Sequence, residues 1–452
     1  MFGIKEGQGG CISDSIAGEL KKRIEDRTAV VAVVGLGYVG LPLVAAFHQA
    51  GFHVIGFDTD EEKIRKIDRG ECYLKHLGVE LSQTLAASDR FEGSSDPICF
   101  SRCDSVHICV PTPLDDQRKP DLGYVESSMR ALTEHLRPGS LVVLESTSYP
   151  GTTREVVLPI LEEHDLELGK NIFVAFSPER EDPGRKDLEL REICKLIGGL
   201  DEISTELAEF LYSQAFINMH SVKSAEIAEA AKILENIYRS VNIALVNEMK
   251  VVLQKMDIDI WEVIKAADTK PFGFKAFYPG PGLGGHCIPI DPFYLSWRAQ
   301  QKGIPTRFIE LAGEINTDMP KYVVSKIDEA LKSQKKSLKE ASVLLLGIAY
   351  KPDVDDTRET PAAELLRLLK EEEVVVSYHD PHIPTFPSKR NYLFDLSSVP
   401  LTAEIVAAAD CVVVVTDHRA IDWQLVADHS SLIVDTRNAV RKYNPVGEVW
   451  LA

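Results

Sequence analysis

The residues with the clearest chemical potential lie in one glycine- and proline-rich segment. It runs from Phe277 to Pro292 and reads FYPGPGLGGHCIPIDP, with Cys287 as its single cysteine and Asp291 four residues later. Proline removes a backbone donor and clashes with the preceding turn, so we predict a rigid loop rather than a helix or a strand interior. A thiol on such a loop is a candidate nucleophile. Taken alone, the segment would favour the alternative of a cysteine packed as a small hydrophobic side chain.

A second candidate site follows the apolar run Val30–Val34, which is typical of a strand buried on both faces. Immediately after it the sequence GLGYVG, residues 35–40, has GxGxxG spacing and leads into a helical segment, and a second predicted strand, 53–57, ends at Asp58. This context predicts a dinucleotide-binding fold, in which Asp58 accepts hydrogen bonds from the adenosine ribose. A 2′-phosphate would meet its negative charge, so we expect NAD rather than NADP. The alternative is a strand–turn–helix whose glycines serve only a tight turn.

Polar residues recur at the ends of later predicted strands. The run 105–110 leads into VPTP at its last residue, the run 141–144 is followed by ESTS, and the run 172–176 is followed by SPER. Ligands of open α/β sheets bind beyond the carboxyl ends of the strands, so we expect Thr112, Ser146, Thr147 and Glu179 on the cofactor side. Hydroxyl residues in turns usually serve only as caps, but their repetition at successive strand ends favours a site.

Residues 225–256 contain neither proline nor glycine, which predicts one helix of about 30 residues and about 45 Å. Such a helix usually links domains or packs against another subunit. Lys232 and Asn236 are four residues apart and therefore share one face. From periodicity alone, the preferred alternative for Lys232 is a solvent-exposed lysine.

Strands and helices alternate again from about residue 342. Predicted strands at 343–351, 374–378, 411–416 and 432–434 indicate a second Rossmann-like domain without the glycine motif. We expect it to hold a different ligand, with Lys351 and Arg358 as partners of a phosphate or carboxylate. Surface ion pairs with nearby aspartates are the alternative. The predicted fold class is α/β, with two Rossmann-like doubly wound domains joined by a long central helix. We place the domain boundaries at 1–222, 223–325 and 326–452.

The composition limits the partners. The chain of 452 residues is 44% hydrophobic and 26% charged, with a formal net charge of -19. This charge argues against nucleic acid as the main partner, because phosphate binding needs basic patches. No apolar run approaches the roughly 20 residues of a membrane helix. The eight cysteines form no disulfide or zinc framework. We therefore expect a cytoplasmic protein with free thiols, no metal, and neither nucleic acid nor membrane as partner.

Several motifs occur in a fixed order along the chain: GLGYVG, VPTP, EST, SPER, AKILEN around Lys232, GGHCIPIDP and AYKPDVDDTRE. Together they resemble the UDP-glucose/GDP-mannose dehydrogenase family, from about Val31 to Arg437. The SPEREDPG segment and the long segment around Cys287 are most similar to UDP-N-acetylglucosamine 6-dehydrogenases. Where the UDP-glucose branch typically has asparagine and lysine, this chain has Ser177 and Ile290.

The resemblance implies NAD-dependent oxidation of the C6 alcohol of a UDP-N-acetylhexosamine, with UDP-N-acetyl-D-glucosamine expected, to a carboxylate. It also implies three sets of residues. The implied catalytic residues are Cys287, Lys232, Asn236, Asp291, Glu179 and Thr147. The implied cofactor-binding residues are Gly35, Leu36, Gly37, Tyr38, Val39, Gly40, Asp58, Lys63, Pro111, Thr112, Thr147 and Arg358. The implied substrate-binding residues are Glu179, Arg180, Lys232, Asn236, Phe277, Tyr278, Gly282 and Lys351.

The roles follow from the family chemistry. Cys287 would form a thiohemiacetal and then a thioester, because an aldehyde must become tetrahedral before it can lose a second hydride. Lys232 would stabilise the oxyanion with help from Asn236. Asp291, with Thr147, would orient a water and relay protons, and Glu179 would assist thioester hydrolysis.

Three alternatives stay open at this point. The same chemistry could act on UDP-N-acetylgalactosamine, UDP-N-acetylmannosamine, UDP-glucose or GDP-mannose. The chain could instead be a catalytically silent NAD-binding or scaffold protein. A 2-hydroxy-acid dehydrogenase would need neither the cysteine nor the second domain.

The long helix predicts a homodimer or larger homo-oligomer, and the family implies synthesis of surface polysaccharide precursors.

Overall fold

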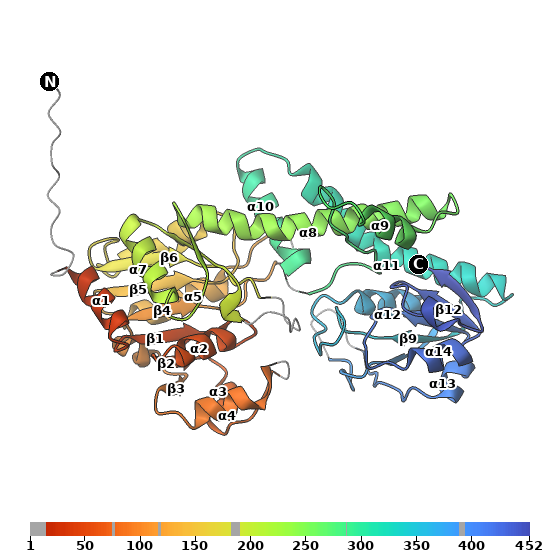
Figure 1. The fold of residues 1–452 in the computed structure, drawn as a ribbon, viewed down its shortest axis with the longest axis horizontal. Helices are drawn as coiled ribbons and strands as arrows, with labels where there is room; N and C mark the ends of the chain where they lie inside the picture. Colours follow the sequence, from red (N-terminus) through yellow and green to blue (C-terminus); the bar gives the residue numbers. More distant parts are fainter. Residues whose placement is uncertain (1–14, 75–76, 116–118, 182–189, 286, 388–393) are drawn as a thin grey trace. The chain divides into compact units, whose positions relative to one another are not determined.

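The computed structural model describes residues 15–74, 77–115, 119–181, 190–285, 287–387 and 394–452. The chain forms two compact units, Met1–Leu234 and Glu235–Ala452. Each unit has its own largely parallel sheet covered by helices, which can be followed by colour from red to yellow-green and from green to blue (Figure 1). In the described ranges, none of the helices has both the length and the apolar character needed to cross a bilayer.

The first unit contains an eight-stranded sheet in the order β3-β2-β1-β4-β5-β6-β7-β8, and its β6–β7 pair is antiparallel. The strands are β1 (Val30–Val34), β2 (His53–Phe57), β3 (Phe91–Ser94), β4 (Ser105–Ile108), β5 (Ser140–Leu144), β6 (Ile172–Phe176), β7 (Lys195–Gly199) and β8 (Met219–Val222). The helices are α1 (Ile16–Glu25), α2 (Gly40–Gln49), α3 (Glu61–Asp68), α4 (Val79–Ala86), α5 (Gly123–Thr133), α6 (Leu158–Glu162) and α7 (Glu202–Tyr212).

Alternate residues of β1 pack into two separate cores, which explains its uninterrupted apolar sequence. Val31 and Val33 belong to the core that includes residues of α1, α2 and α7. Ala32 and Val34 belong to the core formed with α5 and α6 on the other face. A strand with helices on both faces has no polar side, and this double covering is the doubly wound arrangement predicted from the sequence.

The second unit contains a five-stranded sheet in the order β10-β9-β11-β12-β13, with every pair parallel. Its strands are β9 (Ser342–Leu346), β10 (Val375–His379), β11 (Cys411–Val414), β12 (Leu432–Asp435) and β13 (Glu448–Leu451). Its helices are α9 (Ile260–Ala267), α10 (Cys287–Gln301), α11 (Arg307–Ser333), α12 (Pro361–Glu371), α13 (Ala403–Ala408) and α14 (Trp423–His429). The residues of β9 again alternate between two cores, one with α11 and α12 and one with α13 and α14.

The predicted long helix is observed as α8 (Ala225–Gln254), a single helix of 30 residues. Its first turns are fixed to the segment that follows β5 by Glu229, which is fully buried. The Glu229 carboxylate accepts hydrogen bonds from the backbone N–H groups of Gly151 at 2.6 Å and Thr153 at 2.8 Å, and from the Thr153 hydroxyl at 2.7 Å. This anchor sets the position of the next turn of α8, which carries Lys232.

The fold-class prediction is confirmed, but one local prediction is wrong. The segment 277–292 was expected to contain no helix, whereas α10 begins at Cys287 and continues through Pro292. The first N–H groups of a helix have no acceptor within it, so Pro289 in the first turn costs no hydrogen bond. Pro292 lies inside the helix and does cost one. Residues 277–285 are outside helix and strand, as expected.

Candidate active site

The loop after β1 depends on two glycines that have no room for a side chain. Gly35 has a φ of +91°, and a Cβ there would lie 2.8 Å from the carbonyl oxygen of Cys109, just after β4. A Cβ on Gly40 would lie 1.9 Å from the carbonyl oxygen of Gly35. Gly37 differs, because a Cβ there would have nothing within 4 Å. The backbone at Gly37 therefore faces open space, which fits close approach of a ligand.

Asp58 follows β2 and is held against this loop. Its side-chain Oδ2 accepts hydrogen bonds at 2.9 Å from the backbone N–H of Leu36 and from Lys63 Nζ. Oδ1 accepts at 2.9 Å from the backbone N–H of Asp60. The Lys63 side chain is 34% exposed, so a ribose hydroxyl can replace it on the carboxylate. The loop, the start of α2 and Asp58 fit a dinucleotide, as the sequence predicts.

The predicted hydroxyl residues connect the segments after β4 and β5. Thr112 Oγ1 donates to the carbonyl oxygen of Thr147 at 2.7 Å, and Ser146 Oγ donates to the carbonyl oxygen of Val110 at 2.7 Å. Both donors are buried, whereas Pro111 beside them is exposed. These two hydroxyls therefore act on the backbone, and the half-buried side chain of Thr147 is the one more accessible to a ligand.

Glu179 and Lys232 lie close together after β6. Glu179 Oε1 accepts hydrogen bonds at 2.6 Å from the backbone N–H groups of Arg180 and Glu181. Lys232 Nζ donates to the Glu179 carbonyl oxygen at 2.5 Å. Lys232 is only 7% exposed, so the alternative of a solvated lysine does not hold. The Arg180 guanidinium donates to the carbonyl oxygen of Cys194 at 2.8 Å.

Beneath Glu179 lies a buried polar cluster that the sequence analysis did not find. Lys195 Nζ is 2.7 Å from Glu145 Oε2, and the Tyr212 hydroxyl donates to the other oxygen of Glu145. His107 Nδ1 is 2.9 Å from the same hydroxyl. The available signal was a charged residue at each end of an apolar run, Glu145 after SLVVL and Lys195 before LIGG.

In the second unit, Cys287 is the first residue of α10 and is half-buried. Asp291 lies one turn later, which places both residues on one face of the helix. Asp291 is 1% exposed, and its Oδ2 accepts a hydrogen bond at 2.5 Å from Nδ2 of the fully buried Asn236. The oxygen of Asn236 accepts from Arg239. A helix start, rather than a loop, thus presents the predicted nucleophile, and helix N-termini stabilise negative charge.

The glycine-rich loop before Cys287 is attached by buried amides. Asn247 accepts from the backbone N–H of Gly280 at 3.0 Å and donates to Asn316 Oδ1 at 3.0 Å. A Cβ on Gly280 would lie 2.5 Å from Arg437 Nη1, so the Arg437 guanidinium packs directly against the backbone of this loop. Neither Asn247 nor Arg437 was singled out from the sequence, because nothing in their local pattern distinguishes them.

The remaining predicted loop residues differ in their surroundings. Gly282 has a φ of +136°, a backbone conformation that favours glycine. Phe277 makes an edge contact with Tyr238, with ring centroids 5.7 Å apart. Tyr278 stacks on Trp261 at 5.5 Å and is half-exposed. The loop therefore has both a packed and an accessible aromatic ring.

Three sequence models of one known family match the chain in order. The NAD-binding domain of the UDP-glucose/GDP-mannose dehydrogenase family matches residues 29–216, its central domain residues 226–318, and its UDP-binding domain residues 344–442. The chain belongs to this family. The predictions of an NAD-dependent nucleotide-sugar dehydrogenase, and of NAD as its cofactor, are confirmed.

Individual relatives of this dehydrogenase act on UDP-N-acetylhexosamines by name. A UDP-N-acetyl-D-mannosamine dehydrogenase of Methanococcus maripaludis is 34% identical over 392 residues, which cover 86% of each chain. A UDP-N-acetyl-D-glucosamine 6-dehydrogenase of Pseudomonas aeruginosa is 35% identical over 365 residues, covering 80% of this chain and 85% of the relative. The solved UDP-D-ManNAc dehydrogenase of Pyrococcus horikoshii has a TM-score of 0.83 at 30% identity, covering 93% and 98% of the two chains.

In the second unit of the dehydrogenase, Arg358 is paired with Asp356. Its Nε is 2.8 Å and its Nη2 2.6 Å from the Asp356 Oδ2 atom, so the ion-pair alternative is observed. The Arg358 carbonyl oxygen also accepts from the backbone N–H of Gly285 at 2.9 Å. Lys351 Nζ lies 5.9 Å from the centroid of the Tyr350 ring. Ligand roles for Arg358 and Lys351 stay predictions.

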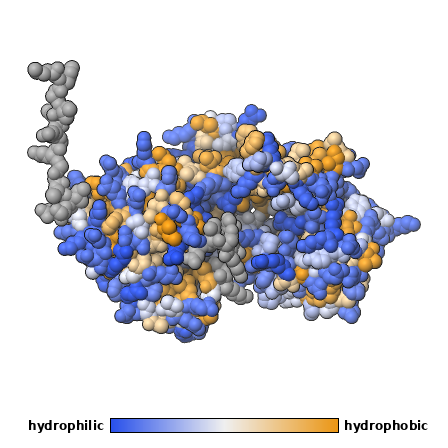
Figure 2. Space-filling view, in the orientation of Figure 1, coloured by the Kyte–Doolittle hydropathy of each residue, from blue (hydrophilic) through white to orange (hydrophobic). Residues whose placement is uncertain are grey.

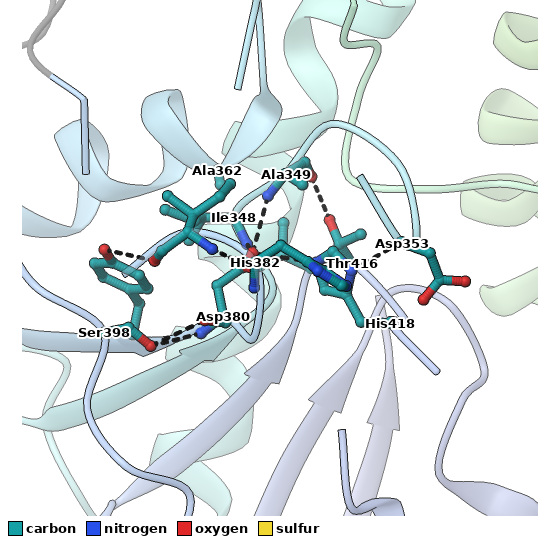
Figure 3. A network of polar contacts seen from close by, with 12 residues as sticks. Ile348, Ala349, Asp353, Ala362, Asp380, His382, Ser398, Thr416 and His418 are labelled. Carbon is teal, nitrogen blue, oxygen red and sulfur yellow. Dashed lines mark hydrogen bonds and ion pairs between the residues drawn. The ribbon is translucent and has the colours of Figure 1, made fainter. Parts of the chain in front are cut away.

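A turn of the same design as the β1 loop occurs in the second unit of the dehydrogenase (Figure 3). Gly347 has a φ of +77°, and a Cβ there would lie 2.3 Å from the carbonyl oxygen of Thr416. Asp380 follows β10, and its Oδ2 accepts from the backbone N–H of Ile348 at 2.7 Å, as Asp58 does from Leu36. The side-chain partner of the carboxylate differs between the two turns. Asp58 Oδ2 accepts from Lys63, whereas Asp380 Oδ2 lies 3.1 Å from Nε2 of the fully buried His418.

His418 also belongs to a group with Asp353 and His382 whose possible metal-ligand atoms all lie within 4.8 Å of one another. His418 Nδ1 already accepts the backbone N–H of Asp353 at 2.9 Å. The Asp353 carboxylate accepts two hydrogen bonds from Arg419, at 2.9 Å and 2.5 Å. These hydrogen bonds make His418 and Asp353 members of one polar network.

Proposed function

We propose that this dehydrogenase oxidises the C6 alcohol of a UDP-N-acetylhexosamine to the uronate, with UDP-N-acetyl-D-glucosamine as the first substrate to test. The observation that carries the proposal is the arrangement at the start of α10. Cys287 occupies the first turn, and Asp291, one turn later, is buried and bound by Asn236. A thiol at a helix N-terminus beside an oriented carboxylate suits covalent capture of an aldehyde.

The chemistry has an oxidation, a covalent capture, a second oxidation and a hydrolysis. NAD+, when bound, supplies the acceptor for the hydride in each of the two oxidations. Between them, the Cys287 sulfur bonds to C6 of the aldehyde, and the aldehyde oxygen carries the negative charge or takes a proton. The resulting thiohemiacetal becomes a thioester when C6 gives up its second hydride and its oxygen releases any proton that it took, through the proton relay of Asp291 and Thr147. Water then bonds to C6, the carbon–sulfur bond breaks, and the thiol is restored with release of the carboxylate.

The chain's residues supply charge and proton transfer for these steps. Lys232 stabilises the oxyanion, with Asn236 as a second donor. Asp291 orients a water and relays protons together with Thr147, and Glu179 takes the proton of the water that opens the thioester. The burial of Lys232 and Asn236 supports these roles, because donors shielded from water act more strongly on developing charge.

The substrate-binding role of the second unit follows the same reasoning. The second unit contains residues 344–442, which match the family's UDP-binding domain. We propose that the nucleotide sugar is contacted by Lys351 and by the loop with Phe277, Tyr278 and Gly282. Arg180 is the proposed contact in the first unit, and Arg358 the proposed contact to the nicotinamide. The three-part division at 1–222, 223–325 and 326–452 is likewise a proposal.

Replacement of Cys287 tests the covalent mechanism. Cys287→Ala is expected to abolish uronate formation, because no thioester can form, while binding of NADH and UDP is retained. The assay is product analysis by mass spectrometry, with NADH counted per acid formed. Wild type should give two NADH for each acid. Undiminished uronate from Cys287→Ala would contradict the mechanism, and one NADH per sugar from the wild type would indicate release of the aldehyde.

UDP-N-acetylmannosamine is the second candidate substrate, because several relatives are named for that activity. The two sugars differ only in stereochemistry at C2, which few contacts read. A panel of UDP-N-acetylglucosamine, UDP-N-acetylmannosamine, UDP-N-acetylgalactosamine, UDP-glucose and GDP-mannose, compared by kcat/KM with NADH readout, decides between them. Absence of NADH production across the panel would favour a silent NAD-binding protein.

We also propose a homodimer or larger homo-oligomer that acts in the cytoplasm on surface polysaccharide precursors. Exposed apolar residues recur along one side of the later turns of α8: Tyr238, Leu245, Met249 and Val252. Their spacing of seven, four and three residues forms one stripe. An apolar patch is also visible over the region of α9, at the upper right in Figure 2. A second copy of the chain is the expected cover, and sedimentation velocity tests it.

A further inference from the structure

One buried ammonium group lies between two carboxylates at the base of the Glu179 region. Lys195, the first residue of β7, is 3% exposed. Its Nζ is 2.7 Å from Glu145 Oε2 and 3.4 Å from Glu179 Oε2. The Glu145 side chain is fully buried, whereas that of Glu179 is 13% exposed. Lys195 therefore connects an interior carboxylate with one that reaches the surface of the unit.

The other groups around Glu145 add no positive charge. Burial lowers the pKa of His107, so its ring is neutral beside Tyr212. Burial, and then the charge of Glu145, raise the pKa of Tyr212 well above its usual value, so the phenol stays a donor. The same two causes raise the pKa of the buried Cys109 thiol, which also stays neutral.

Lys195 itself keeps its proton. Burial alone would lower the pKa of Lys195, but the charges of Glu145 and Glu179 more than offset this effect and raise it overall. Burial would likewise raise the pKa of Glu145, but the Lys195 charge and then the contact with His107 lower it overall. Glu145 and Lys195 are thus both ionised, and Glu179 shares the same ammonium.

Two further cations lie near Glu179, but their observed hydrogen bonds go to backbone carbonyl oxygens and not to the Glu179 carboxylate. Lys232 Nζ donates to the Glu179 carbonyl oxygen, and the Arg180 guanidinium donates to the carbonyl of Cys194. The Glu179 carboxylate receives backbone N–H groups on Oε1 and the Lys195 ammonium on Oε2. Within the ranges that the structure describes, Lys195 is the cation within 4 Å of this carboxylate.

We propose that Lys195 is a positioning residue for Glu179, and that Glu145 sets how strongly its ammonium acts on that carboxylate. Lys195 holds Oε2 while the two N–H groups hold Oε1, so the carboxylate is oriented. Glu145 draws the ammonium toward the interior, which leaves Glu179 able to accept a proton. This inference rests on the proposed function, in which Glu179 takes the proton of the hydrolytic water.

The arrangement predicts that two substitutions move the titration of Glu179 in opposite directions. In Glu145→Gln the ammonium faces Glu179 alone, so the pKa of Glu179 falls. In the double variant Lys195→Met/Glu145→Gln the cation is gone without leaving a buried unpaired charge, so the pKa of Glu179 rises. Each change should be about one pH unit. A purely structural disturbance would move both variants in the same direction.

The test is carbodiimide labelling of Glu179 across pH 4 to 8, located by peptide mass spectrometry, because the reagent modifies the protonated carboxyl. It needs no turnover. The same proteins are then mixed with NAD+ and UDP-N-acetylglucosamine, and uronate release is followed over the same pH range. Glu163→Gln, which removes one partner of the exposed Arg130–Glu163 pair, serves as a control and should move neither readout.

We expect the labelling midpoint of Glu145→Gln to fall and that of the double variant to rise, with the acidic limb of uronate release moving likewise. Circular dichroism verifies that each variant is folded. Coincident midpoints in all variants, or midpoints that move in one direction, would overturn the positioning role. If midpoints move oppositely but the wild type releases no uronate, the proposed function fails and the pairing of Lys195 with Glu179 stands.

Discussion

Lys250 on α8 offers a test of burial energetics away from the cysteine and the glycine motif. It is 3% exposed, and among the described residues its Nζ has no hydrogen-bond partner. The ammonium lies 5.2 Å from the centroid of the Tyr322 ring. Burial, and then the charge of Arg437, lower the pKa of Lys250 to about 7, with Asp435 opposing. We therefore predict that replacing this lysine with the similarly long, apolar methionine stabilises the second unit.

The magnitude follows from linkage. An unfolded lysine has a pKa of about 10.4, so folding must release a proton from Lys250 or bury a charge. The resulting loss in the free energy of unfolding is complete below pH 7, declines as the pH rises from about 7 to about 10.4, and is absent at higher pH. At about 1.36 kcal/mol per pKa unit, the difference between the pKa values of Lys250 in the unfolded and folded states corresponds to on the order of 4 kcal/mol of lost stability at pH 7. The cation–π contact with Tyr322 returns roughly 1 to 2 kcal/mol of this when Lys250 is charged.

The assay is urea unfolding of wild type and Lys250→Met at pH 7 and pH 10, followed by tryptophan fluorescence. All four tryptophans, Trp261, Trp297, Trp423 and Trp450, belong to the second unit, so the signal reports the part that contains Lys250. We expect Lys250→Met to be more stable by about 2 to 4 kcal/mol at pH 7, and the advantage to shrink at pH 10.

Lys326→Met is the matched control. Lys326 Nζ lies 5.6 Å from the same Tyr322 ring but is paired with Glu329 at 2.6 Å. Its replacement should change stability by less than about 1 kcal/mol and without this pH dependence. The reasoning is refuted if Lys250→Met is no more stable than wild type at pH 7. A stability difference equal at both pH values would also refute it.

The NAD-binding loop supports two further predictions. Gly40→Ala is expected to destabilise the first unit by about 2 kcal/mol or more, because its Cβ would meet the Gly35 carbonyl oxygen at 1.9 Å. Gly37→Ala, with nothing within 4 Å of the Cβ, should keep the stability but weaken NADH binding at least about tenfold in a fluorescence titration, and equal stability losses would contradict this. The wild type should use NAD with a much higher kcat/KM than NADP. Asp58→Asn should lower the ratio of the two kcat/KM values, because it removes the negative charge that a 2′-phosphate would meet. Equal use of both cofactors by the wild type would contradict the ribose contact proposed for Asp58.

Local patterns in the sequence were sufficient for most of the strands but not for side-chain partners. The strands 30–34 and 53–57 match β1 and β2, because their apolar runs and glycine turns are local signals. The strands β3, β7, β8 and β13 were not predicted. The pairing of Glu145 with Lys195 joins residues 50 positions apart through the ends of β5 and β7, which only the strand order brings together.

The start of α10 shows a different limit. Four prolines and four glycines in the segment 277–292 argued against a helix around Cys287, yet the helix begins at that residue. The glycines lie before it, and Pro289 occupies the first turn, where no N–H bond is lost. Composition was therefore a sound guide to residues 277–285 but not to the boundary. Helical spacing alone also favoured a solvent-exposed Lys232, because it does not reveal what lies opposite each face, and only the resemblance pointed to a site residue.

The shared turn of the two units has a consequence for how they can recognise nucleotides. Both use one aspartate to hold the chain as it leaves the first strand, Asp58 in one case and Asp380 in the other. The Lys63 side chain on Asp58 is 34% exposed, so a sugar hydroxyl can replace it, whereas the ring of His418 on Asp380 is fully buried. The ribose contact proposed for Asp58 thus has no accessible counterpart at Asp380, and we expect the second unit to recognise a nucleotide through other atoms.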